Sequence, residues 1–183
     1  CSRSTRQRLK KCDISRYYVK KGIHHEFIVN YTSLSKIKGF SKTYAYTEED
    51  FNSLVFDDFF YPITVLDEGD NFVGGAIIGI YNNTYADYIL SSYSSKILNA
   101  GRLLIYFAQK HTYENGFPHL NLGGGTSEND SLMDYKMSFG SDRMPVNYFK
   151  LIFDPLIFES IYKRNCNLAL EESFFPPQNE SKE

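Results

Sequence analysis

The segment Phe72-Val-Gly-Gly-Ala-Ile-Ile-Gly-Ile-Tyr81 is the longest apolar run in this chain of 183 residues. It stands between two other stretches rich in β-branched and aromatic residues, Tyr61–Leu66 and Tyr85–Ser92. The breaks between the three stretches, Asp67–Asn71 and Tyr81–Thr84, have the polar composition typical of turns. The sequence therefore predicts three strands joined as an antiparallel meander.

The composition is that of a folded protein of one ordinary domain. Hydrophobic residues make up 42% of the chain and aromatic residues 16%, which excludes intrinsic disorder. The apolar run at Phe72–Tyr81 is far shorter than the ~18–20 residues of a membrane-spanning helix. Three cysteines with no Cys-x-x-Cys spacing form neither a disulfide framework nor a zinc site, so we expect a cytoplasmic protein without a bound metal.

Helical patterns surround the predicted meander. We expect helices at Ser4–Arg16, His24–Lys38 and Asn99–Asn115, a short helix from Thr47 through Phe56, another at Asp130–Phe139 and a last one at Pro155–Asn167. In the second of these, Phe27, Tyr31, Leu34 and Ile37 recur at the helical period, and Gly39 follows as a C-cap. Thr47 with Asp50 resembles a capping box for the short helix. A buried strand is expected at Phe117–Leu122 and a final strand at Val146–Phe153. A strand–helix–strand unit beside an antiparallel meander predicts an α+β, mixed three-layer fold, in which helices flank a mostly antiparallel sheet.

Charge is distributed unevenly along the chain. Residues 1–21 contain eight Lys or Arg and one acid, a charge of +7, so the remaining residues carry −9 to give the net charge of −2. From Thr43 to Ser95 there is no Lys or Arg. The basic segment has two interpretations: a surface that contacts phosphate groups of RNA or of a nucleotide, or a solvated helix.

Two stretches resemble the C-terminal acyltransferase half of the FemABX-like proteins, a family with the GNAT fold. The first is Phe72–Thr84 with the aromatic strand that ends at Ser91-Ser92. The second is His119-Leu-Asn-Leu-Gly-Gly-Gly125 followed by Asp130-Ser-Leu-Met-Asp-Tyr-Lys-Met-Ser-Phe-Gly140. Family members have Phe-Lys-x-x-Phe in this position, and here Tyr135 replaces the first Phe. The similarity extends over roughly residues 6–153.

The resemblance implies a GNAT-like acyl-CoA N-acyltransferase fold and transfer of an aminoacyl or acyl group to an amine. In this interpretation residues 1–22 are a basic helical segment that links two halves, 23–170 form one GNAT-like domain, and 171–183 are a frayed tail. The donor is an aminoacyl-tRNA or an acyl-CoA, with no tightly bound cofactor. The acceptor is an amine, with a bacterial peptidoglycan (muropeptide) precursor as one option for a cell-wall enzyme. Since the chain begins at Cys1 and not at Met, we expect a fragment or a processed product, and the resemblance leaves open a missing N-terminal GNAT half as a partner.

The candidate substrate site follows the predicted strand at Phe117–Leu122. Consecutive backbone N–H groups of the glycines can form an anion nest, although the same glycines suit a tight turn with positive φ. Lys136 is the candidate catalytic residue, because its charge can neutralise a phosphate or a developing oxyanion; it can also be an ordinary exposed lysine. The residues expected at the substrate site are Gly123, Gly124, Gly125, Asp130, Ser131, Tyr135 and Phe139. For Asp130, a helix N-cap is favoured over a general base.

The candidate donor site is Lys96-Ile-Leu-Asn-Ala-Gly-Arg102, at the start of the helix expected over Asn99–Asn115. In CoA-dependent GNAT enzymes the equivalent loop is richer in glycine and binds pyrophosphate through bare N–H groups. Here Asn99 replaces one glycine, whereas Lys96, Gly101 and Arg102 remain suitable for phosphate. This departure puts CoA binding in doubt. Two alternatives to a FemABX-type enzyme therefore stay open: a non-catalytic or tRNA-binding half of a tandem protein, and a conventional acetyl-CoA-dependent N-acetyltransferase.

Overall fold

A computed structural model describes residues 1–39, 44–55, 58–82, 84–124, 131–145, 149–163 and 167. The chain divides into two compact units, Cys1–Asp142 and Arg143–Glu183. The first unit contains a sheet and all described helices except one. None of the helices within the described ranges is both long and apolar enough to cross a membrane.

The first unit is built on a sheet of five strands in the order β1-β2-β3-β4-β5. Its strands are β1 (Tyr17–Lys21), β2 (Phe60–Asp67), β3 (Phe72–Asn82), β4 (Tyr85–Tyr93) and β5 (His119–Asn121). The first four pair antiparallel, and β5 pairs parallel to β4. The predicted meander is confirmed as β2–β3–β4, and so is the mixed α/β, mostly antiparallel fold class.

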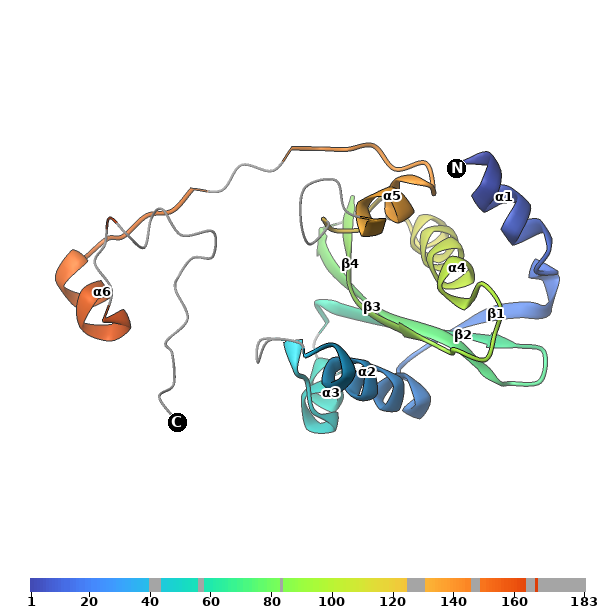
Figure 1. The fold of residues 1–183 in the computed structure, drawn as a ribbon, viewed down its shortest axis with the longest axis horizontal. Helices are drawn as coiled ribbons and strands as arrows, with labels where there is room; N and C mark the ends of the chain where they lie inside the picture. The colour runs from blue at the N-terminus through green and yellow to red at the C-terminus, as the bar shows by residue number, and fades with distance from the viewer. Residues whose placement is uncertain are drawn as a thin grey trace. The chain divides into compact units, whose positions relative to one another are not determined.

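Helices cover both faces of this sheet (Figure 1). On one face lie α1 (Arg3–Lys10), α4 (Ala100–Glu114) and α5 (Ser131–Met137); on the other lie α2 (His25–Lys38) and α3 (Glu48–Val55). The core consequently has two layers of buried side chains. One joins Leu103 and Leu104 of α4 to the sheet, and the other joins Phe27 of α2 and Phe51 of α3 to it.

Two adjacent glycines in β3 allow helices to approach the sheet closely from both sides. A Cβ built on Gly74 would lie 3.2 Å from Leu104 Cδ2 of α4, and one on Gly75 would lie 2.8 Å from Phe27 Cδ2 of α2. Successive residues of a strand face opposite sides of the sheet, so the Gly-Gly pair serves one helix on each face. This accounts for the two small residues in the middle of the most apolar segment.

A β-bulge in β4 changes which side chains face α4. Ile77 of β3 pairs with Leu90, whereas the next residue, Ile78, pairs with Tyr88, so Ile89 is an extra residue. Tyr88 therefore faces the α4 side, while Leu90, two residues later, packs with Phe27 on the α2 side. The inserted residue reverses the alternation for the rest of the strand.

Several local sequence signals are confirmed. The Thr47 and Asp50 side chains form a reciprocal capping box at the start of α3. The Thr47 hydroxyl accepts a hydrogen bond of 3.2 Å from the Asp50 N–H, and the Asp50 carboxylate accepts one of 2.7 Å from the Thr47 N–H. Gly39 ends α2 with left-handed backbone, at φ 59°. The expected apolar stripe of α2 was partly wrong, because Ile37 is 83% exposed and the buried positions are Phe27, Ile28, Tyr31 and Ser35.

Other predicted elements need correction. The helix expected over Ser4–Arg16 ends at Lys10, and residues 17–21, which no strand was predicted to include, form β1 at the sheet edge. The strand expected over Phe117–Leu122 is reduced to β5, and its two end residues are exposed because it lies at the other edge. Short edge strands carry little of the apolar alternation on which the prediction relied.

The second unit contains α6 (Pro155–Tyr162), with Asp154 as N-cap. The helix expected over Pro155–Asn167 ends at Tyr162, because Lys163 has left-handed backbone with φ 53°. The final strand expected over Val146–Phe153 is not formed by its described part, residues 149–153. The tail 171–183 lies outside the described residues, and the linking role of residues 1–22 stays a prediction.

The Gly-Gly pair of β3 leads to a stability prediction. Gly75→Ala should lower the free energy of unfolding by about 1–3 kcal/mol, since the new methyl group overlaps the buried Phe27 ring. Gly69→Ala is the control, because a methyl group there meets only Asn71 and Asp67 in an exposed turn. Urea unfolding of both variants measures the difference. Equal stability of Gly75→Ala and the original protein would contradict the packing described for α2.

Candidate functional site

The site is at the point where β4 and β5 stop pairing. Parallel pairing runs only from Tyr85↔His119 to Asp87↔Asn121, while β4 continues to Tyr93. In the described part of the chain, no strand pairs with residues 88–93 on the β5 side. Backbone N–H and C=O groups on this edge consequently face a gap rather than a neighbouring strand.

Helix α4 begins directly after this open stretch of β4. Its first turn borders a hollow of about 250 Å³. The hollow, called here the α4 hollow, is lined by Tyr93, Ser94, Ser95, Ile97, Asn99, Ala100, Gly101, Arg102 and Tyr135. The N-terminus of a helix attracts negative charge through its free N–H groups and its dipole. The hollow is therefore suited to an anionic group.

Three of the four residues predicted for the donor site line this hollow. Asn99 has left-handed backbone, at φ 60° and ψ 21°, which is a conformation that Gly adopts without strain and that Asn tolerates better than most residues. Arg102 lies in the first turn of α4, and its Nε is buried without a hydrogen-bond partner among the described residues. Lys96 is exposed and is not part of the lining.

Two tyrosines narrow the hollow above Gly101. A Cβ on Gly101 would lie 3.1 Å from Tyr93 Cε1 and 3.2 Å from the Tyr135 hydroxyl. The Arg102 guanidinium lies 5.1 Å from the centre of the Tyr135 ring, a cation–π distance. Burial raises the pKa of Tyr135 to about 12, although the Arg102 charge opposes the shift. The phenol therefore stays protonated and can act as a hydrogen-bond donor.

Few backbone N–H groups of this helix start remain free. Those of Ala100, Arg102 and Leu103 donate to the carbonyl oxygens of Ile97 or Asn99. Only the N–H of Gly101 lacks an acceptor within the described ranges. One free N–H group beside an arginine can bind a phosphate oxygen, but it is not the multiple N–H cradle of a glycine-rich loop.

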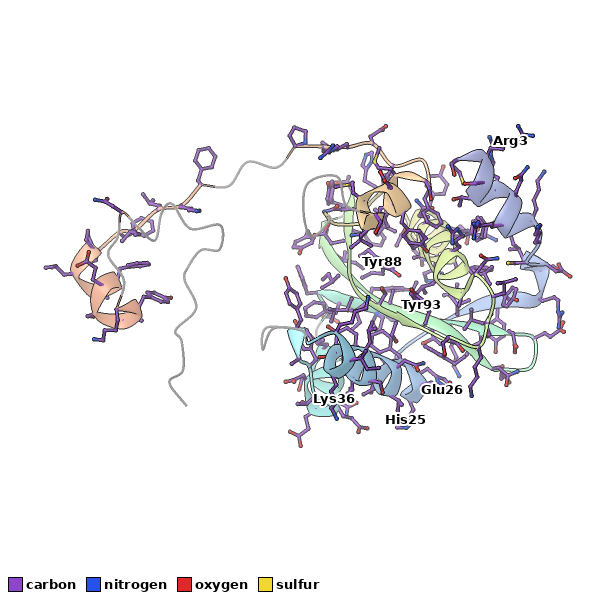
Figure 2. All side chains as sticks on the ribbon, viewed as in Figure 1. Arg3, His25, Glu26, Lys36, Tyr88 and Tyr93 are labelled. Carbon is purple, nitrogen blue, oxygen red and sulfur yellow. The ribbon has the colours of Figure 1, made fainter. Side chains whose placement is uncertain are left out.

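The β-bulge places Tyr88 on the same side of the sheet as Tyr93. Tyr88 and Tyr93 are five residues apart, so a regular strand would direct them to opposite faces; with the bulge both face α4 (Figure 2). Burial raises the pKa of the Tyr88 phenol far above its usual range, and the Ser91 hydroxyl partly opposes this. Alternation in the sequence contained no signal for a bulge, so this pair was not predicted.

The predicted substrate residues are brought together only in part. Lys136 Nζ donates a hydrogen bond of 2.6 Å to the Gly124 carbonyl oxygen, so the candidate catalytic lysine does lie at the glycine turn. Gly123 has φ 72°, and its N–H donates to Asn121 Oδ1 at 2.9 Å. The first N–H of the expected anion nest therefore has an internal partner. Gly125 and Asp130 lie outside the described residues.

The remaining predicted residues divide between the two sides of α5. Tyr135 faces the α4 hollow, while Lys136 faces the glycine turn. Phe139 is buried against Ile105 and Leu122, and its ring lies 5.3 Å from that of Tyr135. Ser131 begins α5 and is exposed. Phe139 is thus a packing residue that supports Tyr135.

His111 does not belong to this site. His111 Nε2 lies 3.1 Å from the Tyr61 hydroxyl at the opposite end of α4, and burial lowers its pKa. This favours a structural role for His111 over that of a general base. Across the described ranges, no three His, Cys, Asp or Glu side chains converge as metal ligands.

Comparison with solved structures identifies the fold. An aminoglycoside acetyltransferase from an uncultured soil metagenomic sample, solved with sisomicin, superposes with a TM-score of 0.53 at 14% identity over 75% of this chain and 97% of its own. A proposed acetyl transferase from Pyrococcus furiosus gives 0.51 at 20% identity over 74% and 99%. The BH1408 protein of Bacillus halodurans, as a tetramutant, gives 0.54 at 12% over 74% and 99%.

The chain therefore has the GNAT acyltransferase fold, as predicted. Similarity at these identities establishes the fold and not the activity. No protein-family model and no curated protein sequence matches the chain. The FemABX-like resemblance rests accordingly on the motif residues alone.

Proposed function

We propose that this protein is an N-acyltransferase that binds its acyl donor in the gap between β4 and β5, with an anionic group of the donor in the α4 hollow. The observation that carries the proposal is the end of β4–β5 pairing at Asp87 and Asn121, after which β4 continues to Tyr93 at the α4 hollow. The gap offers unpaired strand edge to the acyl part of a donor, and Arg102 offers charge to a phosphate. The solved structures with this fold include acetyltransferases.

The reaction requires little covalent chemistry from the protein. The amine nitrogen attacks the donor carbonyl, a C–N bond forms, and the bond to the leaving sulfur or oxygen breaks. The amine loses a proton, and the leaving group gains one. Backbone N–H groups at the open edge of β4 can stabilise the intermediate oxyanion, and the neutral Tyr88 phenol can donate a hydrogen bond to the leaving group.

Lys136 and the glycine turn then belong to the acceptor side. Lys136 is half-buried in α5 and donates a hydrogen bond to the Gly124 carbonyl oxygen, so its charge stays beside the turn that follows β5. A cation there attracts the acyl carbonyl oxygen of the donor or an anionic acceptor. An amine acceptor such as a muropeptide precursor fits the FemABX-like resemblance of this segment.

The size of the α4 hollow limits what it holds. At about 250 Å³ it is smaller than the ~300–1,000 Å³ of typical small-molecule pockets, so it suits one phosphate-bearing part of a donor. Acetyl-CoA is the simplest donor with such a group. Its pyrophosphate would contact Arg102, the Gly101 N–H and the two tyrosine hydroxyls.

A second candidate is an aminoacyl-tRNA donor, as in the FemABX-like family. The exposed side of α1 carries Arg3, Arg6, Arg8, Lys10 and Lys11, and none of them makes an ion pair with a described residue. Helix α1 contacts α4, so this charge lies on the same side of the sheet as the α4 hollow (Figure 2). The limited N–H cradle also favours a donor other than CoA. A tRNA-binding half without catalysis would share this surface.

The donor site is tested with Gly101→Ala and acetyl-CoA. The new methyl group would meet Tyr93 and Tyr135 at 3.1–3.2 Å, so affinity for acetyl-CoA should fall about tenfold or more. Unfolding free energy should change little, because Ala favours a helix by ~1 kcal/mol over Gly. Isothermal calorimetry measures the binding, with Gly69→Ala as control. Failure of the original protein to bind acetyl-CoA would exclude the acyl-CoA donor.

The acceptor role is tested with Lys136→Ala. Transfer from the accepted donor to an amine should fall severely, with a change in unfolding free energy within about 1 kcal/mol. Lys110→Ala is the matched control, since Lys110 makes only an exposed contact of 3.8 Å with Glu114. Steady-state kinetics measure the effect. Unchanged turnover in Lys136→Ala would remove this residue from the mechanism.

The RNA candidate is tested by salt dependence. Replacing Lys10 and Lys11 with Gln should reduce the slope of log K against log salt for tRNA binding by about 1–2. The same change at Lys36 and Lys38, on the opposite face of the sheet, should leave the slope unchanged. Fluorescence anisotropy with labelled tRNA gives both slopes. Equal slopes in the two double variants would exclude α1 as the RNA surface.

A further inference from the structure

Helix α1 is attached at both ends to segments that line the α4 hollow. At its start, the Ser2 N–H donates 2.7 Å to the Ser138 carbonyl oxygen, and Thr5 Oγ1 donates 2.9 Å to Ser138 Oγ. At its end, Asn99 Nδ2 lies 3.6 Å from Cys12 Sγ. Ser138 follows α5, and Asn99 precedes α4. Helix α1 therefore joins the two segments that carry the walls of the hollow.

Thr5 is the buried part of this connection. Its side chain is fully buried (0% exposed) on a helix whose other surface is strongly basic. A buried hydroxyl is costly unless it forms a hydrogen bond, and here the partner is 133 residues away in the sequence. The bond therefore connects two distant parts of the chain.

Ser138 links Thr5 to Tyr135 through hydrogen bonds. The Ser138 hydroxyl accepts from Thr5 and donates 2.6 Å to the Tyr135 carbonyl oxygen. Helix α5 has only seven residues, and helices of that length depend on tertiary contacts for their stability and orientation. Phe139 fixes α5 from its buried side, but an apolar contact does not set rotation as closely as directed hydrogen bonds do.

Tyr135 is sensitive to such rotation because its ring closes one wall of the α4 hollow. The hydroxyl is close to Gly101, and the ring lies 5.1 Å from the Arg102 guanidinium. A small turn of α5 would move the phenol away from both. The hydrogen bonds of Ser138 are thus in a position to set the width of the hollow.

We infer that Thr5 is a positioning residue: its hydroxyl, acting through Ser138, fixes α5 and thereby places the Tyr135 ring against Gly101 and Arg102. The part of this inference that concerns donor affinity rests on the proposed function. The part that concerns the place of Tyr135 does not. The two parts have separate measurements.

The test compares Thr5→Val with Thr112→Val. Thr112 is also buried, at 3% exposed, but its hydroxyl donates only to carbonyl oxygens within α4, at 2.8 and 3.1 Å. The chain is labelled with ring-¹³C tyrosine, and the Tyr135 signal is assigned with Tyr135→Phe. We expect Thr5→Val to shift the Tyr135 ring signal and Thr112→Val to leave it unchanged. An unshifted Tyr135 signal in Thr5→Val overturns the inference.

Two more variants keep the test decisive. Thr5→Ser retains the hydroxyl and should restore the original Tyr135 signal. Ser138→Ala removes the connection from the other side and should reproduce the shift, which covers the case in which Thr5→Val does not fold. A Tyr135 signal that is original in Ser138→Ala, or shifted equally in Thr5→Ser and Thr5→Val, also overturns the inference.

Donor affinity is measured separately, with acetyl-CoA as the probe. Thr5→Val should weaken binding by about three- to tenfold, the effect of roughly one net hydrogen bond, and Thr112→Val should not. If the original protein binds no acetyl-CoA, the acyl-CoA form of the proposed function fails, while the ring signals still decide the role of Thr5. If it binds and Thr5→Val binds equally well, the positioning role in the hollow fails.

Discussion

The parallel pairing of β4 with β5 lasts for three residues and then ends, and the rest of the site depends on this interruption. Beyond Asp87 and Asn121, β4 and β5 no longer pair among the described residues, so β4 continues to Tyr93 paired only with β3. Backbone groups are costly to leave unpaired in a protein interior. The open edge of β4 is therefore a place where a ligand can complete the hydrogen bonding, and the first turn of α4 lies at its end.

Two glycines of β3 and a β-bulge in β4 determine the packing around this opening. Gly74 and Gly75 let α4 and α2 approach opposite faces of β3 closely. The bulge at Ile89 then directs both Tyr88 and Tyr93 toward α4. A regular strand would have placed one of these phenols in the layer of α2, so the bulge decides which side chains reach the site.

Helix α5 connects two chemically different regions. Consecutive residues of a helix point in directions about 100° apart, so Tyr135 contacts the α4 hollow while Lys136 contacts the glycine turn. The short helix is itself supported by α1 through Thr5 and Ser138. The basic start of the chain thereby contributes a structural contact on one side and an exposed cationic surface on the other.

The sequence by itself determined the meander, the long helix after it, the capping box at Thr47 and Asp50, and the proximity of Lys136 to the glycines, because these follow from local periodicity, turn composition and one short motif. It missed β1 and overestimated the strand after α4, since edge strands have weak patterns. Only the tertiary structure decided that the pairing of β4 and β5 ends early, that a bulge turns Tyr88 and Tyr93 to one side, and that Thr5 reaches Ser138. These features depend on contacts between residues far apart in the chain, and no pattern within a local window of sequence records them.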